Sequence, residues 1–94
     1  MKISYYIDSE TGQPHIYNHN VGKNEVEDIL KRPGEDHPGR EGSRVAIGTT
    51  QAGRYLRVIY VNDLDTNSVF VITAYELKGK PLTAYRRRRR RREQ

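Results

Sequence analysis

The sequence contains no cysteine and no tryptophan, and it has only one phenylalanine and one methionine among its 94 residues. Without cysteine, the chain cannot form a disulfide, a thiolate metal site or a cysteine nucleophile. No apolar run approaches the roughly 18 residues of a membrane-spanning helix, and the N-terminal segment lacks the apolar centre of a secretory signal peptide. These absences predict a cytoplasmic protein with no membrane partner.

Apolar side chains are scarce. They make up 34% of the chain, and the seven tyrosines outnumber the single phenylalanine. A chain of this length forms one small domain, and we expect its core to be thin and partly built from tyrosine rings. Because so small a domain buries only a modest fraction of its surface, its stability is marginal or depends on association. A homodimer is therefore an option that the composition leaves open.

The most prominent positive feature is a run of seven consecutive arginines, followed by Glu93 and Gln94. Residues 1–85 contain ten basic and eleven acidic side chains, a net charge of −1, whereas residues 86–94 contain seven and one, a net charge of +6. We therefore divide the chain into a near-neutral domain, 1–85, and a cationic tail, 86–94. The run consists of Arg86, Arg87, Arg88, Arg89, Arg90, Arg91 and Arg92.

So dense a cationic run predicts binding to RNA or another polyanion. Each arginine can make charge-assisted, bidentate contacts to phosphate. Neutralising about six phosphates would give a log–log salt dependence with a slope of roughly −4 to −5. The simpler interpretation is a disordered, solubilising tail without a defined partner. A membrane surface is disfavoured because Tyr85 is the only apolar side chain beside the run.

The clearest local pattern predicts a helix over residues 23–31. Gly22 stands at the N-cap position and Glu25 follows three residues later, as in a capping box. Pro33 and Gly34 end the pattern. The apolar stripe of this helix, spaced i, i+3 and i+4, consists of Val26, Ile29 and Leu30.

The other segments are predicted to be mostly strands. Residues 2–7 are rich in β-favouring types, and Pro14 can open a short helical turn over residues 15–19. Residues 33–43 are predicted to be a long polar loop. Short turns then join three strands into an antiparallel meander, over residues 44–49, 54–61 and 68–76.

A last helix is predicted to start at Pro81, with Leu82 and Tyr85 as its apolar anchors. Seven like charges in a row repel each other at the i, i+3 and i+4 spacings of a helix. We therefore expect this helix to fray within the arginine run unless an anion neutralises it, with only the first two or so arginines held in place by the fold.

Three segments, covering most of residues 15–87, resemble the BrnT family of bacterial type II toxins, within the RelE-type toxin superfamily. They are His-Ile-Tyr-Asn-His at 15–19 with the acidic helix after it, Arg-Val-Ala-Ile-Gly at 44–48 with Gly-Arg-Tyr-Leu-Arg-Val-Ile-Tyr-Val at 53–61, and Val-Ile-Thr-Ala-Tyr at 71–75 with Ala-Tyr-Arg-Arg at 84–87. Two positions depart from the family pattern. Tyr75 stands where the family usually has arginine, and Asn20 stands where it has glycine.

The resemblance implies an α+β domain of the RelE/BrnT kind, with an antiparallel sheet of three or four strands, N-terminal helices and a basic C-terminal helix. It also implies a toxin that cuts mRNA without a metal or cofactor and is silenced by a cognate antitoxin. The alternatives are a non-catalytic module that binds nucleic acid and a module that binds an acidic partner protein, each keeping the toxin fold.

Metal-independent cleavage of RNA needs cationic side chains around the scissile phosphate and a general acid or base. We predict catalytic roles for His19, Arg54, Arg57 and Tyr85, and phosphate contacts for Arg54, Arg57 and the arginine run. Strand alternation places Arg57 on the same sheet face as Tyr55 and Ile59. A simpler interpretation of Arg57 is an exposed side chain or a cross-strand ion pair with Glu76. Tyr55, Tyr75 and Tyr85 could stack bases or fill the thin core.

His15 and His19 are four residues apart and would share a helix face, a spacing that can hold zinc. A catalytic zinc site needs a third protein ligand, and no glutamate follows either histidine in the metalloprotease pattern. We therefore expect no metal site. The options that stay open are a capping or packing role for these histidines and an acid/base role for His19.

Overall fold

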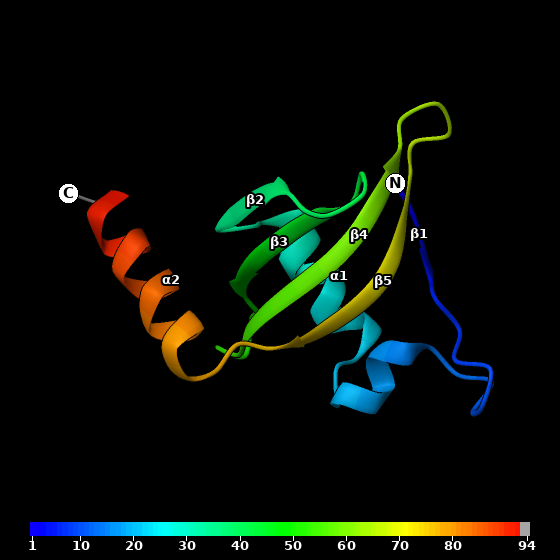
Figure 1. Ribbon diagram of the computed structural model, residues 1–94, viewed down its shortest axis with the longest axis horizontal. Coiled ribbons are helices and arrows are strands. Elements are labelled where there is room, and N and C mark those ends of the chain that lie inside the picture. The colour runs from blue at the N-terminus through cyan, green and yellow to red at the C-terminus, as the bar shows by residue number, and fades with distance from the viewer. Residues whose placement is uncertain (93–94) are drawn as a thin grey trace.

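Five strands form one mixed sheet in the computed structural model of the protein, which describes residues 1–92 (Figure 1). Glu93 and Gln94, which belong to the predicted tail, lie outside the described residues. The strands are β1 (Lys2–Tyr5), β2 (Glu35–Pro38), β3 (Arg44–Thr49), β4 (Tyr55–Asp63) and β5 (Ser68–Glu76). The helical segments are the 3₁₀ helix η1 (His15–His19) and the α-helices α1 (Lys23–Lys31) and α2 (Gly79–Arg92).

The expected fold class, a RelE/BrnT-like antiparallel sheet of three or four strands with N-terminal helices, is wrong. The strand order is β1-β5-β4-β3-β2, and β1 runs parallel to β5 while the other pairs are antiparallel. A strand, not a helix, comes first, and α2 follows the last strand. The predicted meander is present as β3, β4 and β5, but it forms only the middle of the sheet.

β1 is the first of two strands that lie outside the meander. Because β5 is apolar on both faces, it is suited to the inside of a sheet, where it has a hydrogen-bonded neighbour on each side. β1 is its second neighbour, from Lys2 opposite Ser68 to Tyr5 opposite Val71. The sequence predicted a strand at residues 2–7 but gave no sign of its parallel pairing.

The second additional strand, β2, lies within the predicted loop 33–43. Its polar side chains have cross-strand partners: the Tyr60 hydroxyl donates to Asp36, and Arg44 Nε donates to the same carboxylate at 2.9 Å. Burial, together with the hydrogen bond to Asp36, raises the pKa of Tyr60 to about 12. Pro38 is tolerated because β2 is an edge strand, where one row of backbone groups needs no partner.

The main core lies between the sheet and the segment that contains η1 and α1. We call this side of the sheet the covered face. The predicted helix 23–31 is confirmed, and the Gly22 N–H donates to the Glu25 carboxylate at 3.0 Å as the capping box requires. The fully buried members of this core include Ile16, Val26, Ile29, Leu56, Val58 and Val71.

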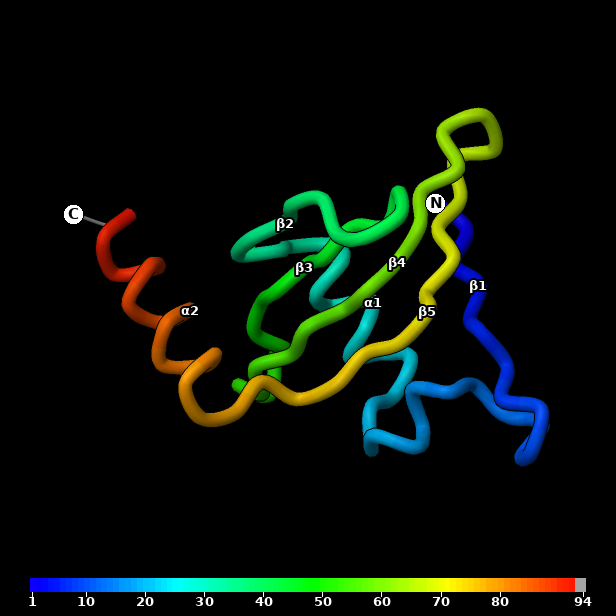
Figure 2. The backbone as a smooth tube through the Cα atoms, in the orientation of Figure 1, coloured from blue at the N-terminus to red at the C-terminus, as the bar shows by residue number. Residues whose placement is uncertain are grey.

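The opposite side of the sheet, which we call the open face, carries a smaller cluster at one end. Ile47, Leu77 and Tyr85 are buried there, with Tyr55 and Leu82 packed against them. This cluster attaches α2, which lies beyond β2 and β3 at the end of the molecule farthest from β1 (Figure 2). Among residues 1–92, no helix is long and apolar enough to span a membrane.

Candidate nucleic-acid interface

α2 continues as a helix through the arginine run to Arg92, so the expectation that it frays within the run is wrong. Two contacts in the middle of the run hold it. Arg88 forms a bidentate ion pair with Glu35 on β2, with Nε–Oε2 at 2.6 Å and Nη2–Oε1 at 2.9 Å. Arg89 Nη1 donates to the Gly34 carbonyl at 2.7 Å. The hydrogen bonds and the ion pair that hold α2 therefore come from the third and fourth arginines of the run.

The ion pair lowers the pKa of Glu35 and raises the pKa of Arg88. The hydrogen bond from Arg88, followed by its charge, holds the pKa of Glu35 below its usual value, although burial opposes this shift. Gly34 contributes by having no side chain, because a Cβ at this position would collide with the Tyr85 hydroxyl. Glu35, Gly34 and Tyr85 together fasten α2 to the sheet.

A cationic cleft lies between α2 and the sheet. Its volume is about 370 Å³, and no acidic side chain of the described residues lines it. Three of its arginines are spaced i, i+3 and i+4 and so share one face of α2, while Arg32 comes from the C-terminal end of α1. The lining residues are Arg32, Thr49, Tyr55, Tyr85, Arg86, Arg89 and Arg90.

Most of the arginine run keeps its charge available. Within residues 1–92, Arg88 is the only member that forms an ion pair. The Arg86 guanidinium lies over the Tyr55 ring, 5.9 Å from its centroid. Besides Arg88 and Arg89, five arginines are left without an ion pair or a hydrogen bond among the described residues. They are Arg86, Arg87, Arg90, Arg91 and Arg92.

Arg57 lies on the open face, as strand alternation predicted, directly opposite Tyr75. Its Nη1 donates to the Tyr75 hydroxyl at 3.3 Å, while its Nε is buried and makes no hydrogen bond within the described residues. Tyr75 also contacts His19, with the two ring centroids 6.1 Å apart. The structure therefore links two of the predicted catalytic residues, His19 and Arg57, through Tyr75.

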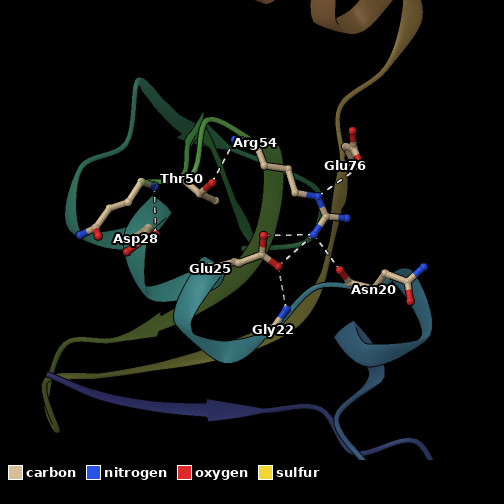
Figure 3. Close-up of polar contacts among 8 residues, drawn as sticks. Asn20, Gly22, Glu25, Asp28, Thr50, Arg54 and Glu76 are labelled. Carbon is tan, nitrogen blue, oxygen red and sulfur yellow. Dashed lines mark hydrogen bonds and ion pairs between the residues drawn. The ribbon is translucent and has the colours of Figure 1, made fainter.

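Arg54 has different surroundings, shown in Figure 3. Its Nη1 donates to both Glu25 oxygens, at 2.9 and 3.1 Å, and to the Asn20 carbonyl at 2.7 Å. Its Nε donates to Glu76 at 3.2 Å, so the ion pair suggested for Arg57 is formed by Arg54 instead. Burial acts to lower the pKa of Arg54, but the hydrogen bonds and charges of the two glutamates outweigh it and raise the pKa.

The four predicted catalytic residues therefore do not form one constellation. Arg54 joins α1 to β5, and Tyr85 is only 3% exposed in the cluster under α2, where burial raises the pKa of its hydroxyl. Sequence reasoning overlooked Arg32 as a member of the cleft, because the approach of the end of α1 to α2 has no local signal. Tyr55 and Tyr75 were recognised as base-stacking candidates from their residue type.

Comparison with known proteins assigns the chain to no family. No protein-family model matches the chain, and searches of curated proteins and of solved structures found no significant similarity. The resemblance to the BrnT family therefore stays a prediction. Within residues 1–92, no group of three or more histidine, cysteine, aspartate or glutamate side chains could hold a metal ion.

Proposed function

We propose that the protein binds single-stranded RNA in the cytoplasm, with the backbone phosphates in the cationic cleft and along α2. The observation that carries this proposal is the set of five arginines without ion pairs on a helix that is fastened to the sheet. Because the backbone of α2 is already ordered, the row of arginines loses less freedom on binding phosphate than a disordered tail would, so its charge acts as a binding surface.

The aromatic side chains beside the cleft favour a single strand over a duplex. Tyr55 forms one wall of the cleft, and Arg57 and Tyr75 continue from it across the open face. Unpaired bases stack on exposed aromatic rings, whereas the bases of a duplex are already stacked on each other. A strand that follows α2 can therefore place its phosphates on arginines and its bases on tyrosines.

The test compares two pairs of charge deletions. Arg90→Ala with Arg91→Ala removes two charges that make no ion pair, and Lys2→Ala with Lys23→Ala removes two charges from β1 and α1. We expect the first pair to weaken binding of a labelled single-stranded RNA, measured by fluorescence anisotropy, on the order of tenfold. The second pair should change the affinity much less. Equal losses would show that net charge, and not α2, determines binding.

A second candidate function is the metal-independent ribonuclease of a type II toxin, and the observation that favours it is the chain His19–Tyr75–Arg57. In such a reaction the 2′-hydroxyl attacks the phosphorus, the bond to the 5′-oxygen breaks, and that oxygen leaves with a proton. His19 would move the protons, and Arg57 would stabilise the negative charge that develops on the phosphate. A cognate antitoxin would be the protein partner.

This second function has its own test. Incubation of end-labelled RNA with the wild type should yield discrete fragments that Arg57→Ala fails to produce, and expression of the wild type should arrest growth. Intact RNA together with normal growth would leave the binding function and remove the catalytic one. Lys78→Ala is the matched control, because it removes a neighbouring positive charge on the loop between β5 and α2.

A further inference from the structure

A second cavity lies where η1 meets β5, on the β1 side of the sheet. Its volume is about 550 Å³, which is within the range of small-molecule sites. We call it the aromatic pocket, and its lining is formed by Tyr6, His15, His19, Ile72, Thr73 and Tyr75. Four of these six side chains are aromatic rings.

The four rings form a chain around the cavity. Tyr6 and His15 have centroids 6.0 Å apart at 62°, and His15 and His19 are 5.2 Å apart at 77°. His19 and Tyr75 are 6.1 Å apart at 56°. None of these pairs is stacked face to face, so ring faces remain for a planar guest.

The floor of the pocket results from an irregularity in the sheet. Ile59 is opposite Thr73 but Tyr60 is opposite Val71, so β5 has one extra residue, Ile72, at this point. In a regular strand, Ile72 and Thr73 would point to opposite faces, but here both line the same cavity. Bulges of this kind redirect side chains and are common beside functional sites.

The backbone that carries the walls of the pocket is anchored. The backbone N–H of His15 donates to the Tyr6 carbonyl at 2.9 Å, and Ile16 between the histidines is fully buried in the main core. Asp8 accepts a hydrogen bond from Asn18 at 2.8 Å and lies 3.5 Å from His15 Nδ1. The backbone and the His15 ring are therefore in place before a ligand arrives, which reduces the entropic cost of binding.

Two polar groups near the pocket lack partners. The Thr73 hydroxyl on the floor and Arg57 Nε beyond Tyr75 are both buried without a hydrogen bond within the described residues. Buried polar groups without partners are uncommon in proteins and call for an explanation such as a missing ligand. A planar ring in the pocket, attached to an anionic group, would lie beside both side chains, although both atoms have almost no exposed surface and a local shift is needed to reach them.

We infer that the aromatic pocket binds one nucleobase, whose ring inserts among the four aromatic side chains while Arg57 contacts the adjoining phosphate. This inference rests on the proposed binding of RNA, to which it adds a separate site for a single splayed-out base. α2 then supplies affinity for the backbone, and the aromatic pocket supplies affinity for a base.

The test uses two RNAs of about ten nucleotides, one with adenine bases and one fully abasic, because the abasic strand keeps the phosphates that contact α2 but has no base for the pocket. We expect the wild type to bind the RNA with bases at least about tenfold more tightly, since stacking of one base contributes that much. Tyr6→Ala and His19→Ala should lower this ratio, and only the share that comes from stacking on Tyr55 should remain. Both side chains are exposed, so both variants should fold, which circular dichroism would verify.

Tyr17→Ala is the control, because Tyr17 is an exposed tyrosine of the same 3₁₀ helix that does not line the pocket. A ratio that is unchanged in the Tyr6 and His19 variants would overturn the inference.

If neither RNA binds the wild type, the proposed function fails, and adenosine 5′-monophosphate then tests the pocket alone by NMR. Absence of shifts at the Ile72 and Thr73 amides would overturn the inference in that case as well.

Discussion

Two arginines three residues apart show how differently the two sides of the sheet use charge. Arg54, immediately before β4, is surrounded by Glu25, Glu76 and the Asn20 carbonyl, all of which accept hydrogen bonds from it. Arg57 has only the Tyr75 hydroxyl, and its Nε has no partner within the described residues. Arg54 on the covered side holds the fold together, whereas the charge of Arg57 on the open side has no acidic partner among the described residues and remains available for a ligand.

The arginine run follows the same division. Arg88 and Arg89 fasten α2 through Glu35 and the Gly34 carbonyl, and their neighbours in the run form no ion pair within residues 1–92. The formal net charge of +5 does not distinguish the arginines that hold the fold from those that have no ion pair. Four variants or conditions test this division, from the largest expected effect to the smallest.

Removal of the Tyr85 ring should have the largest effect. Tyr85→Ala deletes the main buried side chain between α2 and the sheet, and we expect a loss of about 3 kcal/mol in the free energy that docks α2. Hydrogen exchange of the α2 amides measures this loss. Tyr85→Phe keeps the ring, so it should leave α2 docked. If Tyr85→Phe abolishes RNA cleavage while α2 stays docked, the hydroxyl has a catalytic role after all.

The second variant, Arg54→Ala, leaves Glu25 and Glu76 without their shared partner. Because hydrogen bonds to charged groups contribute strongly, we expect the free energy of unfolding in urea to fall by about 2 kcal/mol. RNA affinity should stay close to that of the wild type under conditions where the variant is folded. An affinity loss without a stability loss would place Arg54 among the ligand-binding residues, as the sequence alone predicted.

The third variant, Arg57→Ala, should give the opposite result. No acidic partner is lost, so the free energy of unfolding should change by less than about 0.5 kcal/mol. RNA affinity should fall about tenfold, because a charge-assisted contact to phosphate is removed. Arg57→Lys is the informative companion, since it keeps the charge but cannot form a bidentate contact.

Acidification should have the smallest effect. Arg88 lowers the pKa of Glu35 in the folded protein, so this carboxylate contributes stability that is complete above its usual pKa and is lost as the pH falls through the lower value. Because the Arg88 side chain is 45% exposed, solvent screens the pair, and we expect a contribution of about 1 kcal/mol. The protection factors of the α2 amides, which are corrected for the intrinsic pH dependence of exchange, should therefore fall modestly in acid. In Glu35→Gln these protection factors should not change with pH across this range.

Local signals in the sequence predicted several elements well. Gly22 and Glu25 defined the start of α1, and the dense β-branched and aromatic segments defined β3, β4 and β5. β2 was predicted to be a loop because glycine and proline are frequent around Glu35–Pro38. The residues that stabilise it, Arg44 and Tyr60, come later in the chain. The parallel pairing of β1 likewise depends on a segment more than 60 residues away.

The candidate site was predictable only in part. Residue type alone pointed to Arg57, to the arginine run and to the tyrosines of the open face. Arg54 and Arg57 have different roles because the fold brings carboxylates near Arg54 and, among the described residues, none near Arg57. The amino-acid composition does not predict which carboxylates lie near each arginine. The continuation of α2 through the arginine run has the same origin, since Glu35 lies 53 residues before Arg88.

The salt dependence of RNA affinity tests the central claim most directly. If the five arginines without ion pairs neutralise phosphates of a single strand, the logarithm of the association constant should fall against the logarithm of the salt concentration with a slope of about −3.5. Arg90→Ala with Arg91→Ala should reduce the slope to about −2. A slope near zero, or one that this double variant leaves unchanged, would contradict the account.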